Sequence, residues 1–154
     1  MDDFVRSMTA EELAASVGKE MGVSEWFALS QEKVDAFAEL TDDKYFVHVD
    51  PVRARQTPFG GTIAHGFLTL SALAPMGYQV CPRVDTAKVN LNYGFNRVRF
   101  LSPVPASARI RGRFTLAAFD RTERGCQSTY DVQIEIENGT KPALIAQWII
   151  ASVF

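Results

Sequence analysis

Apolar side chains recur at every second position along much of the second half of the chain. This alternation covers residues 89–100, 108–116 and 130–136, and a further apolar stretch runs from 143 to 153. A period of two predicts β-strands that bury one face. In the first stretch the apolar positions change register beside Gly94, which indicates a β-bulge. Short turn-like connections separate the stretches, so we expect an antiparallel sheet.

Start signals for helices occur along the first half of the chain. A capping-box pattern in residues 9–12 predicts a short helix over 10–17. The bulky residues of 24–29 predict a strand, which leads into Ser30 as the N-cap of a second helix. Asp50-Pro51 predicts a further helix start, because a capping carboxylate precedes a proline at the first helical position.

A nearly continuous apolar stretch, TIAHGFLTLSALAPMGYQV, covers residues 62–80. It is too long for one strand and too interrupted for a membrane span, so it predicts a buried helix that Pro75 bends or shortens. An antiparallel sheet needs a cover for its apolar face, and this helix is the obvious one. The predicted fold class is therefore α+β, as a hot-dog fold in which an antiparallel sheet wraps around a long central helix.

Composition limits the possible domain organisation and classes of function, but it does not identify a binding partner. The 154 residues suit a single domain over 1–154, and 47% of them are apolar, which is enough for a core. The net charge of -2 gives no general attraction to nucleic acid or membrane. Residues 1–3 show no basic start of a secretory signal, and Cys81 and Cys126 are too few for a disulfide scaffold. We expect a cytoplasmic protein with free thiols.

The clearest candidate for chemistry is the segment TDDKYFVHVDP at residues 41–51. Asp43 and His48 stand five positions apart in it, on an expected loop between helices. A carboxylate and an imidazole that converge on one water molecule can remove a proton from water and return one to carbon. The same pattern also arises from acids that are only solvated, with Asp50 as a helix cap, so the segment alone leaves both interpretations open.

A second candidate is the glycine-containing run of residues 60–66 at the predicted start of the central helix. Amides at a helix N-terminus lack partners and carry partial positive charge. The amide of Gly66 could therefore stabilise the oxygen of a thioester whose enolate forms during a reaction. Alternatively, Gly66 only permits close packing. His65 is expected to orient the loop through hydrogen bonds instead of reacting.

Several blocks in the same order resemble the MaoC-like family, which includes (R)-specific enoyl-CoA hydratases, and in particular its NodN-like branch. The blocks are FAELTDDKYFVHVDP, PFGGTIAHGFLTLSAL, LNYGFNRVRFLSPVPASARIRG and KPALIAQW, and the likeness covers about residues 24–148. The resemblance implies reversible hydration of a trans-2-enoyl-CoA to an (R)-3-hydroxyacyl-CoA. It places the catalytic pair on Asp43 and His48 and the amide that faces the thioester oxygen on Gly66. Which member of the pair acts as base stays open.

The sequence departs from the family pattern near the candidate pair. Asp42 stands where a glycine is usual before the aspartate, and Tyr45-Phe46 replaces an amide-containing pair. These changes put in doubt how the loop is held and which acyl chain fits. Some relatives carry a supporting serine on the central helix, and Ser71 is the candidate for it by position.

The same fold also supports functions other than hydration. Hot-dog thioesterases resemble one another in carrying an acid on the central helix, and residues 62–80 contain none. A non-catalytic acyl-thioester-binding protein is the alternative of a different class. Two histidines and scattered carboxylates form no metal-ligand pattern, so no metal is expected. No cofactor is expected beyond coenzyme A as part of the substrate, and the resemblance implies a homodimer.

Overall fold

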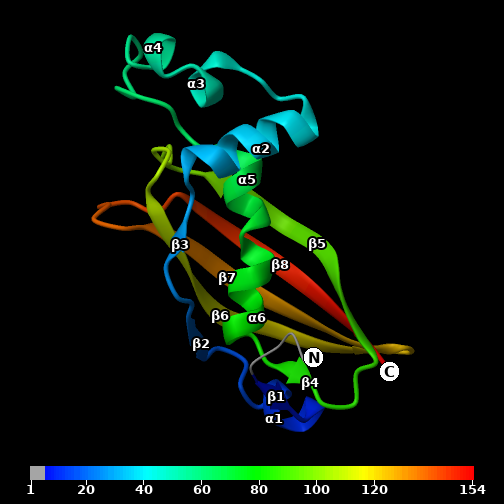
Figure 1. Ribbon diagram of the computed structural model, residues 1–154. Coiled ribbons are helices and arrows are strands. Elements are labelled where there is room, and N and C mark those ends of the chain that lie inside the picture. The colour runs from blue at the N-terminus through cyan, green and yellow to red at the C-terminus, as the bar shows by residue number, and fades with distance from the viewer. Residues whose placement is uncertain (1–5) are drawn as a thin grey trace.

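A curved antiparallel sheet with helices on its inner side makes up most of the computed structural model, which describes residues 6–154 (Figure 1). The helices are α1 (Ala10–Ala14), α2 (Gln31–Thr41), α3 (Phe46–Val49), α4 (Pro51–Ala54), α5 (Gly66–Ser71) and α6 (Leu73–Val80). The strands are β1 (Ser7–Met8), β2 (Glu20–Val23), β3 (Phe27–Ala28), β4 (Arg83–Val84), β5 (Val89–Phe100), β6 (Arg109–Thr122), β7 (Gly125–Ile136) and β8 (Leu144–Val153). The expectation about residues 1–3 falls outside the described part of the chain.

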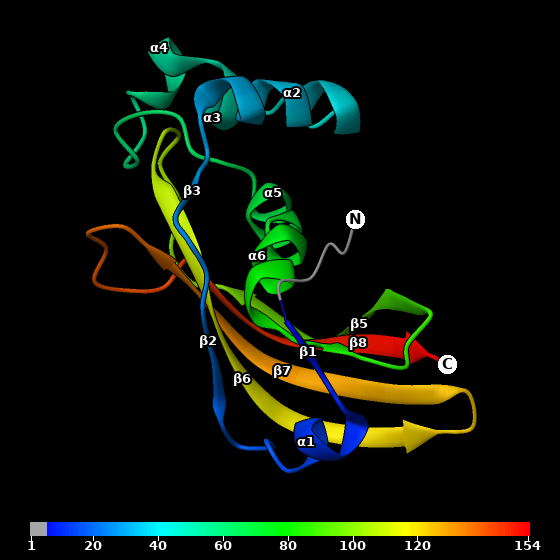
Figure 2. The ribbon, with the colours of Figure 1, turned by 60° about the horizontal axis from the view of Figure 1, so that its bottom comes forward.

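The main sheet has six strands in the order β2-β6-β7-β8-β5, and β3 lies beside β2 on the same edge of β6. All its pairings are antiparallel. Figure 2 shows the sheet curving around α5 and α6, while α2, α3 and α4 lie beyond one end of it. The predicted α+β hot-dog arrangement is therefore confirmed. A separate two-stranded parallel pair joins β1 to β4.

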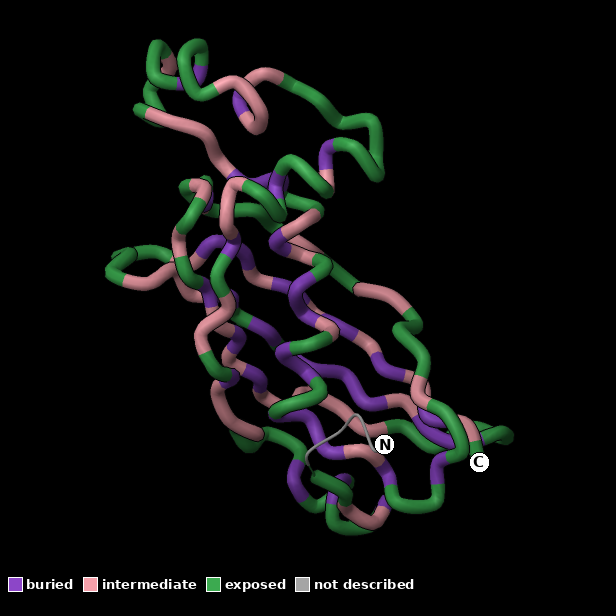
Figure 3. The backbone as a smooth tube through the Cα atoms, in the orientation of Figure 1, coloured by how far each residue is buried: buried purple, intermediate pink, exposed green. Residues whose placement is uncertain are grey.

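The core lies between the inner face of the sheet and α6. Met76 of α6, Phe114 of β6 and Trp148 of β8 are almost fully buried there. Full burial of each large apolar side chain stabilises the fold by roughly 1.5–3 kcal/mol. The helix approaches the sheet closely at Gly77, where an added Cβ would lie 2.7 Å from the Trp148 ring. Figure 3 shows the buried positions running along the central strands and this helix, with the α2–α4 end largely more exposed.

The central helix differs from its prediction over 62–80 in two ways. It begins only at Gly66, because residues 62–64 are extended and their main chain bonds to the segment of residues 104–106. It is also interrupted at Ala72 between α5 and α6. Pro75 has no N–H with which to bond the carbonyl of Ser71, the last residue of α5. The interruption that Pro75 predicted is thus present, whereas the predicted start was wrong.

A β-bulge in β5 turns its apolar side chains from one face of the sheet to the other. The pairing with β8 shifts register beside Gly94, as predicted. Before the bulge Leu91 pairs with Ala151, and after it Phe95 pairs with the buried Trp148. Directly paired residues of antiparallel strands share a face. Leu91 therefore lies on the outer face and Phe95 faces the core, and a second register shift between Phe95 and Arg97 places Val98 opposite the buried Ala146.

The N-terminal region follows its prediction only in part. The capping box is present, with the Glu12 amide donating to Thr9 Oγ1 and the Thr9 amide donating to Glu12 Oε2. Ser30 caps α2 through a contact from the Lys33 amide. The strand predicted over 24–29 is confirmed only at the two residues of β3, which pair with β6, and β2 precedes it. Its bulky residues include Leu29, which is buried without belonging to a strand.

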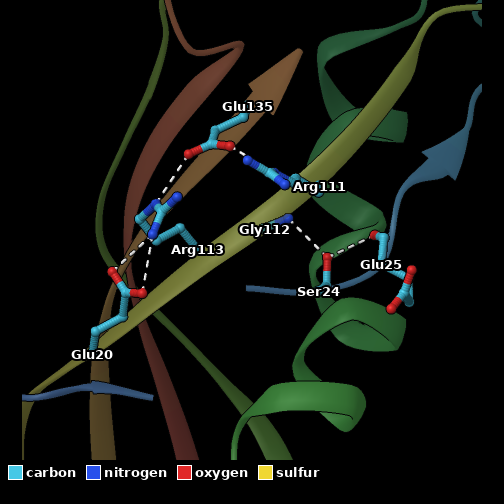
Figure 4. A network of polar contacts seen from close by, with 7 residues as sticks. All are labelled: Glu20, Ser24, Glu25, Arg111, Gly112, Arg113 and Glu135. Atoms are coloured by element: carbon cyan, nitrogen blue, oxygen red, sulfur yellow. Dashed lines mark hydrogen bonds and ion pairs between the residues drawn. The ribbon is translucent and has the colours of Figure 1, made fainter. Parts of the chain in front are cut away.

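Ion pairs join neighbouring strands on the outer face of the sheet (Figure 4). Glu135 of β7 accepts hydrogen bonds from Arg111 and Arg113 of β6, at 2.7 and 3.0 Å. Arg113 also bonds to Glu20 of β2, so one arginine connects three strands. These side chains occupy the positions that alternate with the buried residues of β6 and β7. They contribute to the register in which the strands pair.

Cys81 and Cys126 are both buried and unpaired, which confirms the expected free thiols. Burial raises the pKa of each thiol, so both stay protonated near neutral pH. Among the described residues, none of the helices has the length and apolar character needed to cross a bilayer.

Candidate active site

The predicted acid follows directly after the end of α2. The helix stops at Asp42, whose φ of 59° and ψ of 12° lie in the left-handed region. Helices commonly end on this conformation, and glycine adopts it with the least strain. This geometry explains why a glycine is usual at this position in the family that the sequence resembles. Asp42 and Asp43 are both exposed, and the left-handed turn at Asp42 ends α2 directly before Asp43.

His48 lies in the short helix α3 and is held by the segment that leads into α5. Its Nδ1 is 2.7 Å from the carbonyl oxygen of Ile63. A carbonyl oxygen only accepts, so Nδ1 carries the proton and donates it. In the neutral ring Nε2 then keeps a free lone pair. The amide of Ile63 also donates to the carbonyl of Val47, so α3 and this segment are joined on both sides of the histidine.

His65 is the N-cap residue of α5 and is only 2% exposed. Its Nε2 donates to the main-chain carbonyl oxygen of Asp43 at 2.9 Å, and its ring stacks on that of His48 with centroids 3.8 Å apart. Among the described residues, its Nδ1 has no hydrogen-bond partner. The hydrogen-bonded orienting role expected for His65 matches this geometry, since the bond holds the loop that carries Asp43.

The fold brings Asp43, His48 and His65 together, with one carboxylate oxygen or ring nitrogen from each within 4.8 Å of the others. A water molecule with hydrogen bonds of about 2.8 Å bridges atoms that are about 5 Å apart. The cluster therefore has the spacing to hold one water. It suits a metal ion poorly, because a metal lies in the plane of each imidazole it binds. The rings of His48 and His65 are stacked with their planes inclined by only 26°. No point therefore lies in both ring planes and also at metal–nitrogen bond length from both rings.

His48 stands at the wall of an apolar pocket of about 310 Å³. The lining includes Gly66 and Thr69 from α5, and residues 100–104 at the end of β5 and just after it. A Cβ added to Gly66 would lie 3.0 Å from the ring of Phe100, so the glycine permits close packing there. Gly66 is also the first residue of α5, where amides lack helical partners. Both interpretations of this glycine therefore have a structural basis.

Ser71 forms its side-chain hydrogen bond within its own helix. Its hydroxyl donates to the carbonyl of Phe67 one turn back, and the residue is exposed. The polar α5 side chain that lines the pocket is instead Thr69, which is 2% exposed. In the sequence, this lining residue could have been recognised as a polar threonine three positions after Gly66 in a largely apolar helix. Nothing in the sequence could have identified the carbonyl of Ile63 as the partner of His48, because every residue carries the same group.

The substituted pair Tyr45-Phe46 is held by aromatic contacts. The two rings pack edge to face with centroids 4.8 Å apart, and the Arg53 guanidinium lies 4.2 Å from the centroid of the Phe46 ring. A cation over an aromatic face is attracted by the ring's quadrupole. This contact joins α3 to α4, so the loop is held in place without an amide side chain at residues 45 and 46.

Comparisons with known proteins identify relatives of this chain. Residues 12–138 match the family model described as a MaoC like domain. Nodulation protein N of Rhizobium leguminosarum bv. viciae is 45% identical over 94% of this chain and 91% of its own length. 3-Hydroxyacyl-thioester dehydratase Z of Mycobacterium tuberculosis is 41% identical over 92% of this chain and 94% of its own. The (R)-hydratase of A. caviae superposes with a TM-score of 0.71, covering 87% of this chain and 94% of that one; at 24% identity it supports the shared fold alone.

Proposed function

This chain belongs to the MaoC-like domain family, and from that membership we propose that it is a hydro-lyase that adds water reversibly to the double bond of an enoyl thioester. The observation that carries the proposal is the convergence of Asp43 and His48 beside an apolar pocket. The product is a 3-hydroxyacyl thioester, and the reverse reaction is a dehydration. The name of the 41% identical dehydratase from M. tuberculosis supports this reaction class.

The hydrogen bond from His48 to Ile63 supports His48 as the group that accepts the water proton. With Nδ1 protonated, the lone pair of Nε2 is free to take that proton while the water oxygen bonds to the β-carbon. The carboxylate of Asp43 orients the same water by accepting from its other hydrogen. The π electrons of the double bond move towards the thioester, and the α-carbon then receives the proton that His48 took from the water. Water and the enoyl thioester are the only reactants consumed, and the (R) configuration follows the family resemblance.

Gly66 has the position to stabilise the charge that forms. Its amide stands at the start of α5 and borders the pocket next to His48. An amide donor aimed at the thioester oxygen would stabilise an enolate. The pocket lining includes Phe59, Ile63 and Phe100, which favours an apolar acyl group. We propose coenzyme A as the thioester carrier and no further cofactor.

Rival functions fit less well. Residues 66–80 of α5 and α6 carry no acid, which disfavours a thioesterase with its carboxylate on the central helix. A non-catalytic acyl-thioester-binding protein would not need the bond that orients His48. A cytoplasmic location and the lack of a nucleic-acid or membrane partner stay predictions.

We also propose a homodimer. In the described chain β5 pairs only with β8, so its other edge is free. Leu91 and Tyr93 on this strand are 50% and 64% exposed, which is a large apolar exposure for an edge strand. Light scattering at micromolar concentration is expected to give twice the monomer mass, and a monomer would contradict this proposal.

The test of the proposed reaction is a hydratase assay with crotonyl-CoA and longer trans-2-enoyl-CoAs, following the loss of conjugated thioester absorbance. Asp43→Asn and His48→Ala are each expected to lose about 100-fold or more of the activity, with the fold intact by circular dichroism. Asp42→Asn is the matched control, since it removes a neighbouring exposed carboxylate and should keep the activity. If the wild type is inert at every chain length, hydration of these substrates is excluded and the binding function takes its place.

A further inference from the structure

Gln31, the first residue of α2, uses its side-chain amide to connect three parts of the chain. Its Nε2 donates to the carbonyl oxygen of His48 and to Oδ1 of Asp35, both at 2.8 Å. Its Oε1 accepts from the hydroxyl of Thr62 at 2.5 Å. A primary amide has two N–H donors and one carbonyl acceptor. Both donors and the acceptor are engaged, so the orientation of the amide is defined.

These contacts close a ring that includes the candidate catalytic imidazole. Gln31 holds the main chain of His48 on one side and the side chain of Thr62 on the other. Thr62 precedes Ile63, whose carbonyl accepts from Nδ1 of His48. The main chain of Thr62 is itself anchored, because its carbonyl accepts from the amide of Ala106. The backbone and the ring of His48 are therefore tied to the same rigid segment.

We propose that Gln31 is a positioning residue for His48, acting through Thr62 and the carbonyl of Ile63. This inference rests on the proposed hydratase function. Without the amide, the link from Thr62 to the main chain of His48 is lost and only the bonds of Ile63 to Val47 and His48 remain, so the bond that selects the Nδ1–H tautomer becomes one of several conformations. Paired acid–base chemistry needs reacting groups placed to within a fraction of an ångström. Gln31 thus fixes which nitrogen of His48 faces the substrate.

Gln31→Leu and Thr62→Val each break the ring from a different side. Both are expected to lower kcat for enoyl-CoA hydration by about 10- to 100-fold, while KM changes by less than about threefold. The double variant should cost no more than the worse single one, because both remove the same connection. Thr62→Ser keeps the hydroxyl and should restore kcat to near the wild-type value.

Gln79→Leu is the matched control. Gln79 of α6 also bonds to the main chain through its side chain, since its Oε1 accepts from the amide of Glu25 at 2.9 Å. The control removes a bond of the same kind that is not part of the His48 ring. It should leave kcat unchanged even where the melting temperature falls as far as in Gln31→Leu. Equal losses of kcat in Gln79→Leu and Gln31→Leu would overturn the positioning role.

A second measurement needs no activity. The chain has only two histidines, so nitrogen-15 NMR of the imidazoles is readily assigned with His48→Ala. Wild-type His48 is expected to show a protonated Nδ1 with slow solvent exchange, and Gln31→Leu should speed that exchange and mix the tautomers. An inert wild type with this NMR response would refute the hydratase function and keep the positioning of His48. Unchanged imidazole signals in Gln31→Leu would refute the positioning itself.

Discussion

Nε2 of His65 donates a hydrogen bond to the main-chain carbonyl oxygen of Asp43 at 2.9 Å. The bond joins the N-cap of α5 to the loop after α2, two segments that are 22 residues apart. The same ring stacks on His48, so one buried side chain contacts both members of the candidate pair.

Replacement of His65 should therefore reduce catalysis without removing a reacting group. His65→Phe preserves a flat ring for the stack but leaves the carbonyl of Asp43 without this donor. We expect kcat for enoyl-CoA hydration to fall by about 10- to 100-fold, because the carboxylate loses its fixed position. Steady-state kinetics of the folded variant checks this.

Phe37→Leu serves as the control for His65→Phe, since the Phe37 ring also contacts His65, at a centroid distance of 5.0 Å. It disturbs packing around His65 and leaves the bond to Asp43 in place. An equal loss of kcat in the two variants would contradict the role assigned to that bond.

Asp42→Gly should stabilise the protein. Residue 42 has a φ of 59°, a conformation that costs an ordinary residue about 1 kcal/mol and costs glycine very little. We expect the free energy of unfolding to rise by about 0.5–1 kcal/mol and the melting temperature by about 1–4 °C. Asp42→Ala should be less stable than Asp42→Gly, as measured by urea unfolding. A glycine variant that melts below the wild type would contradict this account of the turn.

The network around Glu135 makes stability depend on pH. Burial by itself raises the pKa of this carboxyl, but the hydrogen bonds and charges of Arg111 and Arg113 outweigh it and hold the pKa below its ordinary 4.5. A lowered pKa in the folded state means that the contribution is complete above that ordinary value and is lost as the pH falls through the folded value. Glu135→Gln should thus lower the free energy of unfolding by about 1 kcal/mol at pH 7 and by less at pH 3.

Urea unfolding of the wild type and Glu135→Gln at the two pH values measures this difference. Glu39→Gln is the control, because Glu39 pairs with Lys44 in an ion pair whose two side chains are largely exposed. Exposed ion pairs contribute little to stability. A loss that is equal at pH 7 and pH 3 would show that Glu135 acts through packing and not through its charge.

Predictions from the sequence succeeded where the signal was local. The strands β6 and β7 follow from alternation with a period of two, because each residue's face depends only on its position along its own strand, and β8 follows from a continuous apolar stretch. The caps Thr9, Ser30 and Asp50 follow for the same reason, since each bonds to amides within three residues of itself. Asp43 and His48 also belong to one short segment, so their proximity could be expected.

Long-range contacts decided the rest. The central helix starts at Gly66 because residues 62–64 bond to residues 104–106, about 40 residues further along the chain. The strand β2 carries no clear alternation, and it forms where β6 offers an unpaired edge. In the site, only the folded chain brings the carbonyl of Ile63 to His48 and the side chain of Gln31 to Thr62. Side-chain identity thus determined which groups the protein has for acid–base chemistry. Their orientation came from main-chain carbonyls, which are alike in every residue and become specific partners only when tertiary folding places them.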